Sequence, residues 1–575
     1  MNTADSMSGT AASSAVADTG DGGWPLRPWL LSLLLGICGL LVHIFWQQDM
    51  RAYDDPLPQW RAAGAAFFFF GGLGAAFALE QRRILWSVIF ALIAGAIIAA
   101  IAWWVSGYWE YGYYWNWSFA AGVAALLISV PLFQTIRDNP EDTPRALPYD
   151  RLHFYSWSDV VVGAASMAFL GASWLLLTLI SVLFQLINID FIQELMREDW
   201  FGWVFSGLSF GAALGVLREN AGLLGVLQRV ALIVLSILAP FLAAALALFL
   251  ISLLFTGLDE LWAATKNTTP ILISCAVAAV ILANAVIRNS PEEASQSRLL
   301  KISAMILALT ILPLAVISAV SIGLRIDQHG FTPERFWVLL IVAIASAYGL
   351  AYLACVALGR SGWSERLRPA NVRLSVALCV IALLLAMPFV DFGAWSARDQ
   401  LARLESGAVS EEDFDYYALA RQFGPTGRAK AEEMAKGEGE RAKQAQLALD
   451  ADNRWEYDDD IKLEQEREIY LVQPDRPLPE ALREKLLGSQ QCKFSACKVI
   501  WDGESRVFVV GQQCDGCPVS RRSFALEDGQ WRSIHTAYTN SDKVETVTEE
   551  TKVEIRTIER RQVFVDGKAV GDSFE

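Results

Sequence analysis

The sequence predicts a mainly α-helical fold, in which a polytopic membrane bundle is followed by a small α+β, β-rich extracytoplasmic domain. Two observations predict the bundle. Hydrophobic residues make up 54% of the 575 positions and charged residues only 19%, whereas a soluble protein has roughly 25% charged residues. Long apolar runs are also confined to the first two thirds of the chain. A third observation predicts the second part: short apolar segments beyond residue 469 flank Asp-Gly pairs, as in β-hairpins.

Composition divides the chain into four segments. Residues 1–25 have almost no aliphatic bulk and are predicted to be a disordered tail. Residues 26–392 hold the apolar runs of the predicted transmembrane domain. Residues 393–468 are rich in acidic side chains and predict a helical linker region, and residues 469–575 form the predicted β-rich domain with a cysteine cluster. The acidic surface, within a formal net charge of −15, argues against nucleic acid as a partner.

About eleven runs in the transmembrane domain approach the roughly 20 apolar residues that a helix needs to cross the hydrocarbon layer. The sixth run is short for a full crossing, whereas the fifth and seventh are long enough to tilt. The spans are expected at roughly 28–46, 62–79, 84–105, 117–134, 160–187, 201–217, 230–256, 269–287, 302–324, 336–358 and 374–391.

The distribution of Lys and Arg predicts the orientation of these spans, because short cytoplasmic loops are enriched in both residues. With the N-terminus placed in the cytoplasm, the inner loops hold 14 Lys and Arg residues and the outer loops hold 6. Because the number of spans is odd, the C-terminal domain is then expected on the outer side. Membrane lipids are the expected surroundings of the bundle.

Glycines and a few polar residues interrupt the apolar runs. Gly207, Gly211 and Gly215 recur at four-residue spacing, which lets another helix approach closely. Three polar residues lie near span ends and are interpreted as interfacial anchors rather than as a proton relay: His43, Asn284 and Asp391.

Four stretches carry a resemblance to a known family. They are WLLLTLISVLFQLINIDFIQEL from Trp174, FTGLDELWAAT from Phe255, RIDQHGFTPERFW from Arg325 and ARDQLARLESGAVSEEDFDYYAL from Ala397. In order and spacing the chain resembles a family of bacterial inner-membrane proteins catalogued as domain of unknown function 4153. The resemblance implies a multi-pass protein of the bacterial inner (plasma) membrane. In the orientation that the Lys and Arg counts predict, its N-terminus is cytoplasmic and its C-terminal domain periplasmic. It supplies no catalytic or ligand-binding residue.

One of these stretches, Arg325–Phe336, is a polar strip between two apolar runs. Gly330 permits a sharp turn, and Thr332 followed by Pro333 and Glu334 is typical of a helix start. The strip is therefore predicted to be a tight outer hairpin. Its arginines either brace the hairpin and reach lipid phosphates or bind an anionic ligand or a partner, and the strip is a possible docking edge for the outer domain. The candidate outer-loop interaction site comprises Arg325, Asp327, Gln328, Glu334 and Arg335.

The eight cysteines form two groups. Four lie in predicted spans and are interpreted as small apolar side chains: Cys38, Cys275, Cys355 and Cys379. The other four have a spacing similar to a zinc ribbon, but the predicted outer location favours oxidation over zinc. Nested around the turn that contains Asp502 and Gly503, the expected disulfides join Cys497 to Cys514 and Cys492 to Cys517, although four cysteines allow three pairings.

No motif for nucleotide binding, nucleophilic catalysis or paired histidine ligation is found, so no enzymatic activity is expected. No cofactor or metal site is expected either, because the acidic run Glu456–Asp460 lacks the glycine-punctuated loop of a calcium site. The first hypothesis is a structural, assembly or sensing protein of the envelope, with envelope proteins as partners. The alternative is a transporter of a small solute, since eleven spans exceed what an anchor needs.

Overall fold

The computed structural model describes residues 24–47, 57–108, 115–139, 146–258, 268–458, 469–473, 476–487, 497–512, 519–527, 529–534, 553–555, 561–565 and 568–574. The chain divides into two compact units. The first comprises residues 1–414 and 421–430, and the second comprises residues 415–420 and 431–575. Most of the predicted tail at residues 1–25 lies outside the described residues. The predicted boundary at residue 392 is not a limit of the first unit, which continues through the helix that comes after the last span.

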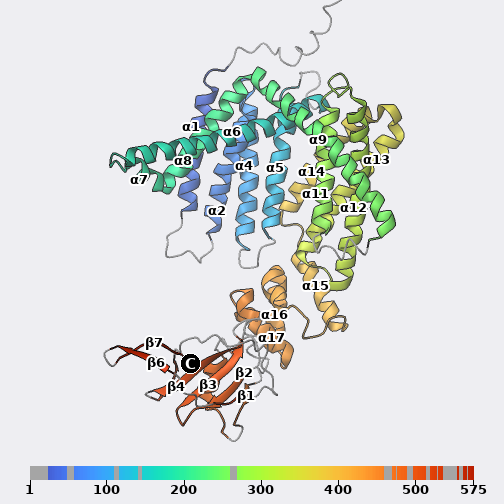
Figure 1. The fold of residues 1–575 in the computed structure, drawn as a ribbon. Coiled ribbons are helices and arrows are strands. Elements are labelled where there is room, and N and C mark those ends of the chain that lie inside the picture. Colours follow the sequence, from blue (N-terminus) through green and yellow to red (C-terminus); the bar gives the residue numbers. More distant parts are fainter. Residues whose placement is uncertain are drawn as a thin grey trace, which may run out of the picture. The chain divides into compact units, whose positions relative to one another are not determined.

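The N-terminal half of the first unit is a group of long helices that pack side by side (Figure 1). A short π-helical turn, η2, joins α2 to α3 and makes them one continuous span. The elements are α1 (Arg27–Trp46), α2 (Gln59–Ala66), η2 (Phe67–Gly71), α3 (Gly72–Ala78), α4 (Ile84–Ser106), α5 (Trp115–Arg137), α6 (Tyr149–Gln185), α7 (Phe191–Arg197) and α8 (Asp199–Glu219).

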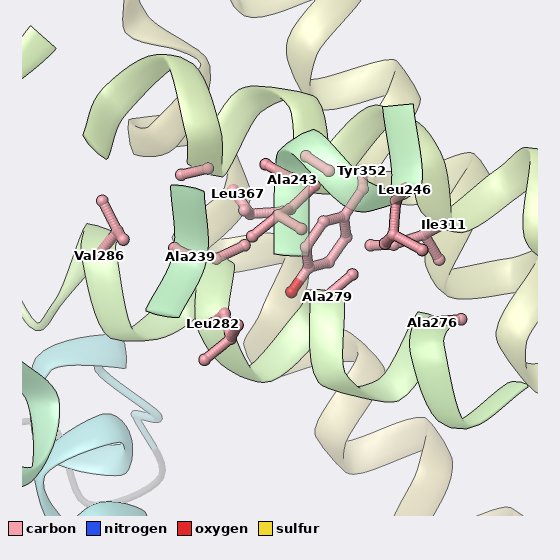
Figure 2. Packing of buried hydrophobic residues seen from close by; sticks show 14 of the residues in the cluster. Ala239, Ala243, Leu246, Ala276, Ala279, Leu282, Val286, Ile311, Tyr352 and Leu367 are labelled. Atoms are coloured by element: carbon pink, nitrogen blue, oxygen red, sulfur yellow. The ribbon is translucent and has the colours of Figure 1, made fainter. Parts of the chain in front are cut away.

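The C-terminal half of the same unit packs around its own apolar core. Alanines and leucines of α9, α11 and α12 surround the fully buried Tyr352 of α13, and Figure 2 shows its ring among these aliphatic side chains. The elements are α9 (Ala221–Thr256), α11 (Thr268–Ile287), α12 (Arg298–His329), α13 (Pro333–Gly359), the short 3-10 turn η4 (Arg360–Gly362), α14 (Trp363–Ala386) and α15 (Phe392–Glu405).

Among the described residues, eleven helical segments are long and apolar enough to cross a membrane, and they correspond to the eleven predicted spans. The sixth, α8, has 21 residues and is longer than predicted. The last span ends at Ala386 rather than at Asp391. Asp391 is instead the N-cap of α15, where its Oδ1 accepts a hydrogen bond from the Ala394 backbone N–H at 2.8 Å. The interpretation of Asp391 as the end of a span is therefore wrong.

The glycine repeat of α8 packs directly on α1, as its spacing predicts. A Cβ on Gly207 would overlap the Leu35 carbonyl group, and one on Gly211 would overlap the Leu31 carbonyl group. At Gly215, the same substitution would overlap the backbone of Pro28. The two helices approach so closely because glycine leaves no side chain between their backbones. Small residues therefore determine the packing of this pair.

The second unit contains helix α17 and a mixed five-stranded sheet in the order β1-β2-β3-β4-β5, with β1 parallel to β2 and the other neighbours antiparallel. Helix α19 covers the sheet through Leu482 and Leu486, which pack on Trp501 and Trp531. The bounds are α17 (Glu440–Asp450), β1 (Ile469–Leu471), α19 (Glu480–Leu487), β2 (Cys497–Trp501), β3 (Arg506–Gln512), β4 (Val519–Glu527) and β5 (Gln530–Ile534). Strands β6 (Arg561–Val565) and β7 (Lys568–Phe574) form a separate antiparallel pair. The prediction of a small β-rich domain with a helix is confirmed.

The predicted turn at Asp502–Ser505 joins β2 to β3, with Trp501 opposite Val507. Cys497 is the first residue of β2 and is fully buried. Its predicted partner Cys514, like Cys492 and Cys517, lies outside the described residues. The disulfide pairing and the zinc alternative therefore stay predictions.

Candidate functional site

The polar strip Arg325–Phe336 comprises the last residues of α12, a three-residue turn and the first residues of α13. Helix α12 ends at His329, and Gly330 comes next with a φ of 71°, a conformation that favours glycine. Thr332 is the N-cap of α13: its Oγ1 accepts a hydrogen bond from the Arg335 backbone N–H at 3.4 Å, and Pro333 occupies the first turn. The predicted hairpin and helix start are confirmed.

Helix α15 is hydrogen-bonded to the backbone of this turn. The Asp399 Oδ2 atom accepts the Phe331 backbone N–H at 2.7 Å. The Gln400 side-chain amide donates to the carbonyl oxygens of His329 at 2.9 Å and of Phe331 at 3.0 Å. These bonds satisfy backbone groups that the end of α12 leaves without a helical partner. We name Asp399, Gln400 and Arg403 the α15 clamp.

The third member of the α15 clamp contacts the last turn of α12. The Arg403 guanidinium donates to the Gln328 carbonyl oxygen at 2.8 Å and to the Asp327 carbonyl oxygen at 3.3 Å. A Cβ on Gly330 would lie 2.6 Å from a side-chain atom of each clamp residue. Gly330 is thus needed for the turn and for the close approach of α15.

Aromatic stacking supports the same junction. The ring of Phe336 stacks on Phe331 with a centroid distance of 4.6 Å and on Phe392 of α15 with a centroid distance of 5.1 Å. Trp395 of α15 meets Phe336 edge-on at 5.6 Å. Such pairs stabilise a contact beyond the burial of their area. Helix α15 is consequently a fixed part of the first unit.

The five predicted site residues have different environments in this hairpin. The Arg335 guanidinium donates to the carbonyl oxygens of His329 at 3.0 Å and of Gly330 at 2.6 Å, so it braces the turn. Asp327 and Gln328 contribute backbone carbonyls to the α15 clamp, while both residues are exposed. The side chains of Arg325 and Glu334 are exposed. A role for these side chains in binding a partner stays a prediction.

A second polar group lies inside the C-terminal half of the bundle. The Asn284 Nδ2 atom donates to the Tyr352 hydroxyl at 2.7 Å, and that hydroxyl donates to the Asn371 Oδ1 atom at 3.0 Å. The Asn371 amide closes the ring by donating to the Asn284 Oδ1 atom at 2.6 Å. Asn284 therefore links α11, α13 and α14, and its interpretation as an interfacial anchor is wrong. We call these three residues the amide–tyrosine ring.

A third polar group consists of charges at one edge of the N-terminal half. The carboxylate of Glu80 pairs with Arg27 and, at 3.6 Å, with Arg218. Arg27 also lies 3.7 Å from the Glu219 carboxylate and donates to the Arg218 carbonyl oxygen at 3.0 Å. We call Arg27, Glu80, Arg218 and Glu219 the Glu80 network. Its opposite charges compensate one another where burial would make an isolated charge costly.

Asp138 lies just beyond α5 and forms a smaller ionic group. Its carboxylate accepts two hydrogen bonds from the Arg137 guanidinium at 2.6 Å and one from the Tyr155 hydroxyl at 2.5 Å. Partial burial opposes ionisation of Asp138, but the hydrogen bonds and charge of Arg137 outweigh it. The pKa of Asp138 is therefore lowered from 3.8, and its carboxylate stays ionised at neutral pH.

A cavity of about 360 Å³ lies between α6 and α8. Trp174 donates from its Nε1 atom to the Ser206 hydroxyl at 3.1 Å in its wall. The full lining is Trp174, Met196, Glu198, Asp199, Gly202, Trp203 and Ser206. Two tryptophans beside two carboxylates make an aromatic and acidic wall.

Sequence reasoning missed the Glu80 network and most of the amide–tyrosine ring. In the sequence, Arg218 is one of the inner-loop Lys and Arg residues that predict the orientation of the spans. A single sequence does not reveal which of these cations lies beside a carboxylate. The one sequence feature that points to Asn284 as a member of this ring is that it is a polar residue within a predicted span. Tyr352 and Asn371 resemble ordinary residues of a span and of a loop until the fold brings them together.

The family model described as "Domain of unknown function (DUF4153)" matches residues 67–433. This match covers most of the N-terminal half of the bundle, the whole C-terminal half, the Arg325–Phe336 hairpin and the α15 clamp. Together with the eleven apolar helical segments, it identifies the chain as a membrane protein. No curated protein and no solved structure matches the chain.

Proposed function

The chain belongs to the DUF4153 family, and we propose that it is a non-catalytic envelope assembly or sensing protein of the bacterial inner membrane. In this proposal the bundle holds the second unit on the periplasmic side, where that unit engages an envelope protein. The excess of Lys and Arg in alternate loops supports this orientation. Two disulfides among the four C-terminal cysteines are part of the proposal, because an oxidising compartment favours them.

The observation that carries the proposal is the α15 clamp. Five hydrogen bonds from Asp399, Gln400 and Arg403 attach α15 to the α12–α13 turn. Backbone carbonyls accept four of these bonds. Because backbone atoms move less than side chains, the bonds fix the position of α15 relative to α12 and α13. A simple tether would not need this attachment, whereas a scaffold or sensor must connect its bundle mechanically to its extramembrane unit.

We propose that the clamp also responds to a displacement of the two helices that form the hairpin. A displacement of α12 relative to α13 would change the distances from Gln400 and Arg403 to the carbonyls of residues 327–331. Because α15 precedes the second unit in the chain, we propose that such a displacement is passed on along the chain toward that unit. This coupling supports a sensing role as well as an assembly role.

The test compares full-length variants in a strain that lacks the protein. In the Gln400→Ala/Arg403→Ala double variant the clamp loses four of its five hydrogen bonds. Arg398→Ala is the matched control, because Arg398 is exposed on the same helix. A photo-crosslinker in the second unit reports its contacts, and growth in bile salts reports envelope integrity. We expect Arg398→Ala to retain the crosslink to an envelope protein and the resistance to bile salts. The double variant should lose both at unchanged protein abundance.

Two results would contradict the proposal. One is an unchanged envelope in the deletion strain together with no reproducible crosslink to an envelope protein. The other is a deletion phenotype limited to the uptake of one solute, which would favour the transporter alternative. Reporter fusions at the N-terminus and after residue 575 test the orientation, and a cytoplasmic C-terminus would overturn the periplasmic part.

A further inference from the structure

Arg368 of α14 is a buried cation without a carboxylate partner among the described residues. It is 8% exposed, and its guanidinium donates to the Ile287 carbonyl oxygen at 3.1 Å. Its Nε atom is buried and has no hydrogen-bond partner among the described residues. A buried charge normally has a partner of opposite charge, because its desolvation is otherwise uncompensated. The environment of Arg368 is therefore incomplete without an anion.

Three further polar residues lie at or beside the end of α11 that Arg368 contacts. Arg288 and Asn289 come directly after Ile287 at the end of α11, and the Nε atom of Arg288 and the Oδ1 atom of Asn289 are buried without hydrogen-bond partners. His153 is also buried, at 6% exposure, and its ring lies near the Asn289 side chain and the Asn284 backbone. The Asn289 side chain lies within hydrogen-bonding reach of the His153 imidazole, and the charge of Arg368 acts on the same ring, which places these groups beside one another. The cluster combines α6, α11 and α14.

The charge of Arg368 acts on the carboxylate of Glu292, but Glu292 does not neutralise Arg368. Glu292 lies in the loop after α11 and is fully exposed. Its pKa is lowered mainly by a hydrogen bond involving Ser290, and the charge of Arg368 contributes least to this lowering. No ion pair joins Glu292 to Arg368 in the described chain. The cluster is consequently rich in positive charge and N–H donors. Arg288 and Asn289 are only half-buried, so the cluster is open toward the loop after α11.

We propose that Arg368, Arg288 and His153 form a binding site for a phosphate-bearing anion. Guanidinium groups match phosphate oxygens in geometry and charge, and the imidazole can add an N–H donor. Basic sites between membrane helices bind phospholipid head groups in the same way. The phosphate is supplied either by an anionic lipid or by a free phosphate compound, and both sources use the same contacts. This site is independent of the α15 clamp.

The experiment uses the full chain and two probes. Inorganic phosphate is titrated against the protein in detergent, with sulfate-free buffer of constant ionic strength. Separately, the protein is placed in nanodiscs of phosphatidylcholine alone or with phosphatidylglycerol. The thermal midpoint reports stabilisation by the ligand, and native mass spectrometry counts bound phosphate or lipid. We expect at least one probe to raise the midpoint of the wild-type protein and to give a stoichiometric adduct.

Variants distinguish a built site from general attraction. Arg368→Gln should weaken binding about tenfold to a hundredfold, the equivalent of one charge-assisted contact, whereas Arg368→Lys should weaken it less. Arg366→Gln is the matched control, because Arg366 is exposed two residues away on the same helix.

A response to phosphate alone assigns a free phosphate compound, and a response to phosphatidylglycerol alone assigns a lipid. No response of the wild-type protein to either probe, or equal losses in Arg366→Gln and Arg368→Gln, would overturn the proposal. If Arg368→Gln does not fold, the wild-type titrations and Arg368→Lys still decide the question.

Discussion

Arg27 and Arg368 are equally buried, at 8% exposure each, but the two halves of the bundle treat them differently. In the N-terminal half, Arg27 meets the carboxylates of Glu80 and Glu219. In the C-terminal half, Arg368 meets only a backbone carbonyl among the described residues. The first half thus compensates its buried charge internally, whereas the second half leaves a buried cation without a carboxylate partner among the described residues.

The largest effect is expected from breaking the compensated half at Glu80. Glu80→Gln would leave Arg27 with the more distant Glu219 and Arg218 without its carboxylate partner. Removing one partner of a buried pair costs about 3–5 kcal/mol. Unfolding in sodium dodecyl sulfate should show this loss, and Glu293→Gln, at an exposed position in the loop after α11, should match the wild-type protein. An equal tolerance of both changes would show that the Glu80 network contributes no net stability.

The second effect concerns the glycine contact of the same half. Gly211→Ala should destabilise the bundle by about 1–3 kcal/mol, because the new methyl group would force α8 away from the Leu31 carbonyl. Gly225→Ala in α9 is the control, since nothing lies within 4 Å of a Cβ at that position and alanine favours a helix. The same unfolding assay compares them, and a stable Gly211→Ala protein would contradict the close packing of α1 and α8.

The third effect tests whether polar groups also stabilise the C-terminal half. Tyr352→Phe removes the hydroxyl that bonds Asn284 and Asn371 and should cost on the order of 1 kcal/mol. Tyr348→Phe is the control, one turn earlier on α13 and outside the amide–tyrosine ring. Thermal unfolding in detergent measures both changes. Equal midpoints would mean that the apolar core alone holds these helices together.

The smallest effect should be a dependence on pH in the compensated half. Because the folded pKa of Asp138 is lowered from 3.8, its carboxylate stabilises the fold fully above that value and loses this contribution as pH falls through the folded pKa. The wild-type protein should therefore lose more stability between pH 7 and pH 3 than Asp138→Asn. Denaturation curves at the two pH values check this expectation, and parallel losses in both proteins would exclude Asp138 as a source of the pH dependence.

The hairpin between α12 and α13 could be predicted from the sequence, because the residues that form its turn act through their own local backbone conformation. Gly330 at positive φ and Thr332 with Pro333 at a helix start depend on their own backbone chemistry. The α15 clamp was not predictable in its residues, because Asp399, Gln400 and Arg403 look like ordinary polar positions of an exposed helix. Their partners are backbone atoms about 70 residues away, and no residue type marks such an acceptor.

The number of apolar segments, the glycine face of α8 and the β-rich C-terminal domain could all be predicted from the sequence alone. Each results from a periodicity or a length that local chemistry imposes on the chain. The packed helices were needed to reveal which buried charges are paired, as Glu80 is with Arg27, and which have no carboxylate partner among the described residues, as with Arg368. Electrostatic partnership depends on distances between elements far apart in sequence, and those distances exist only after the helices have packed.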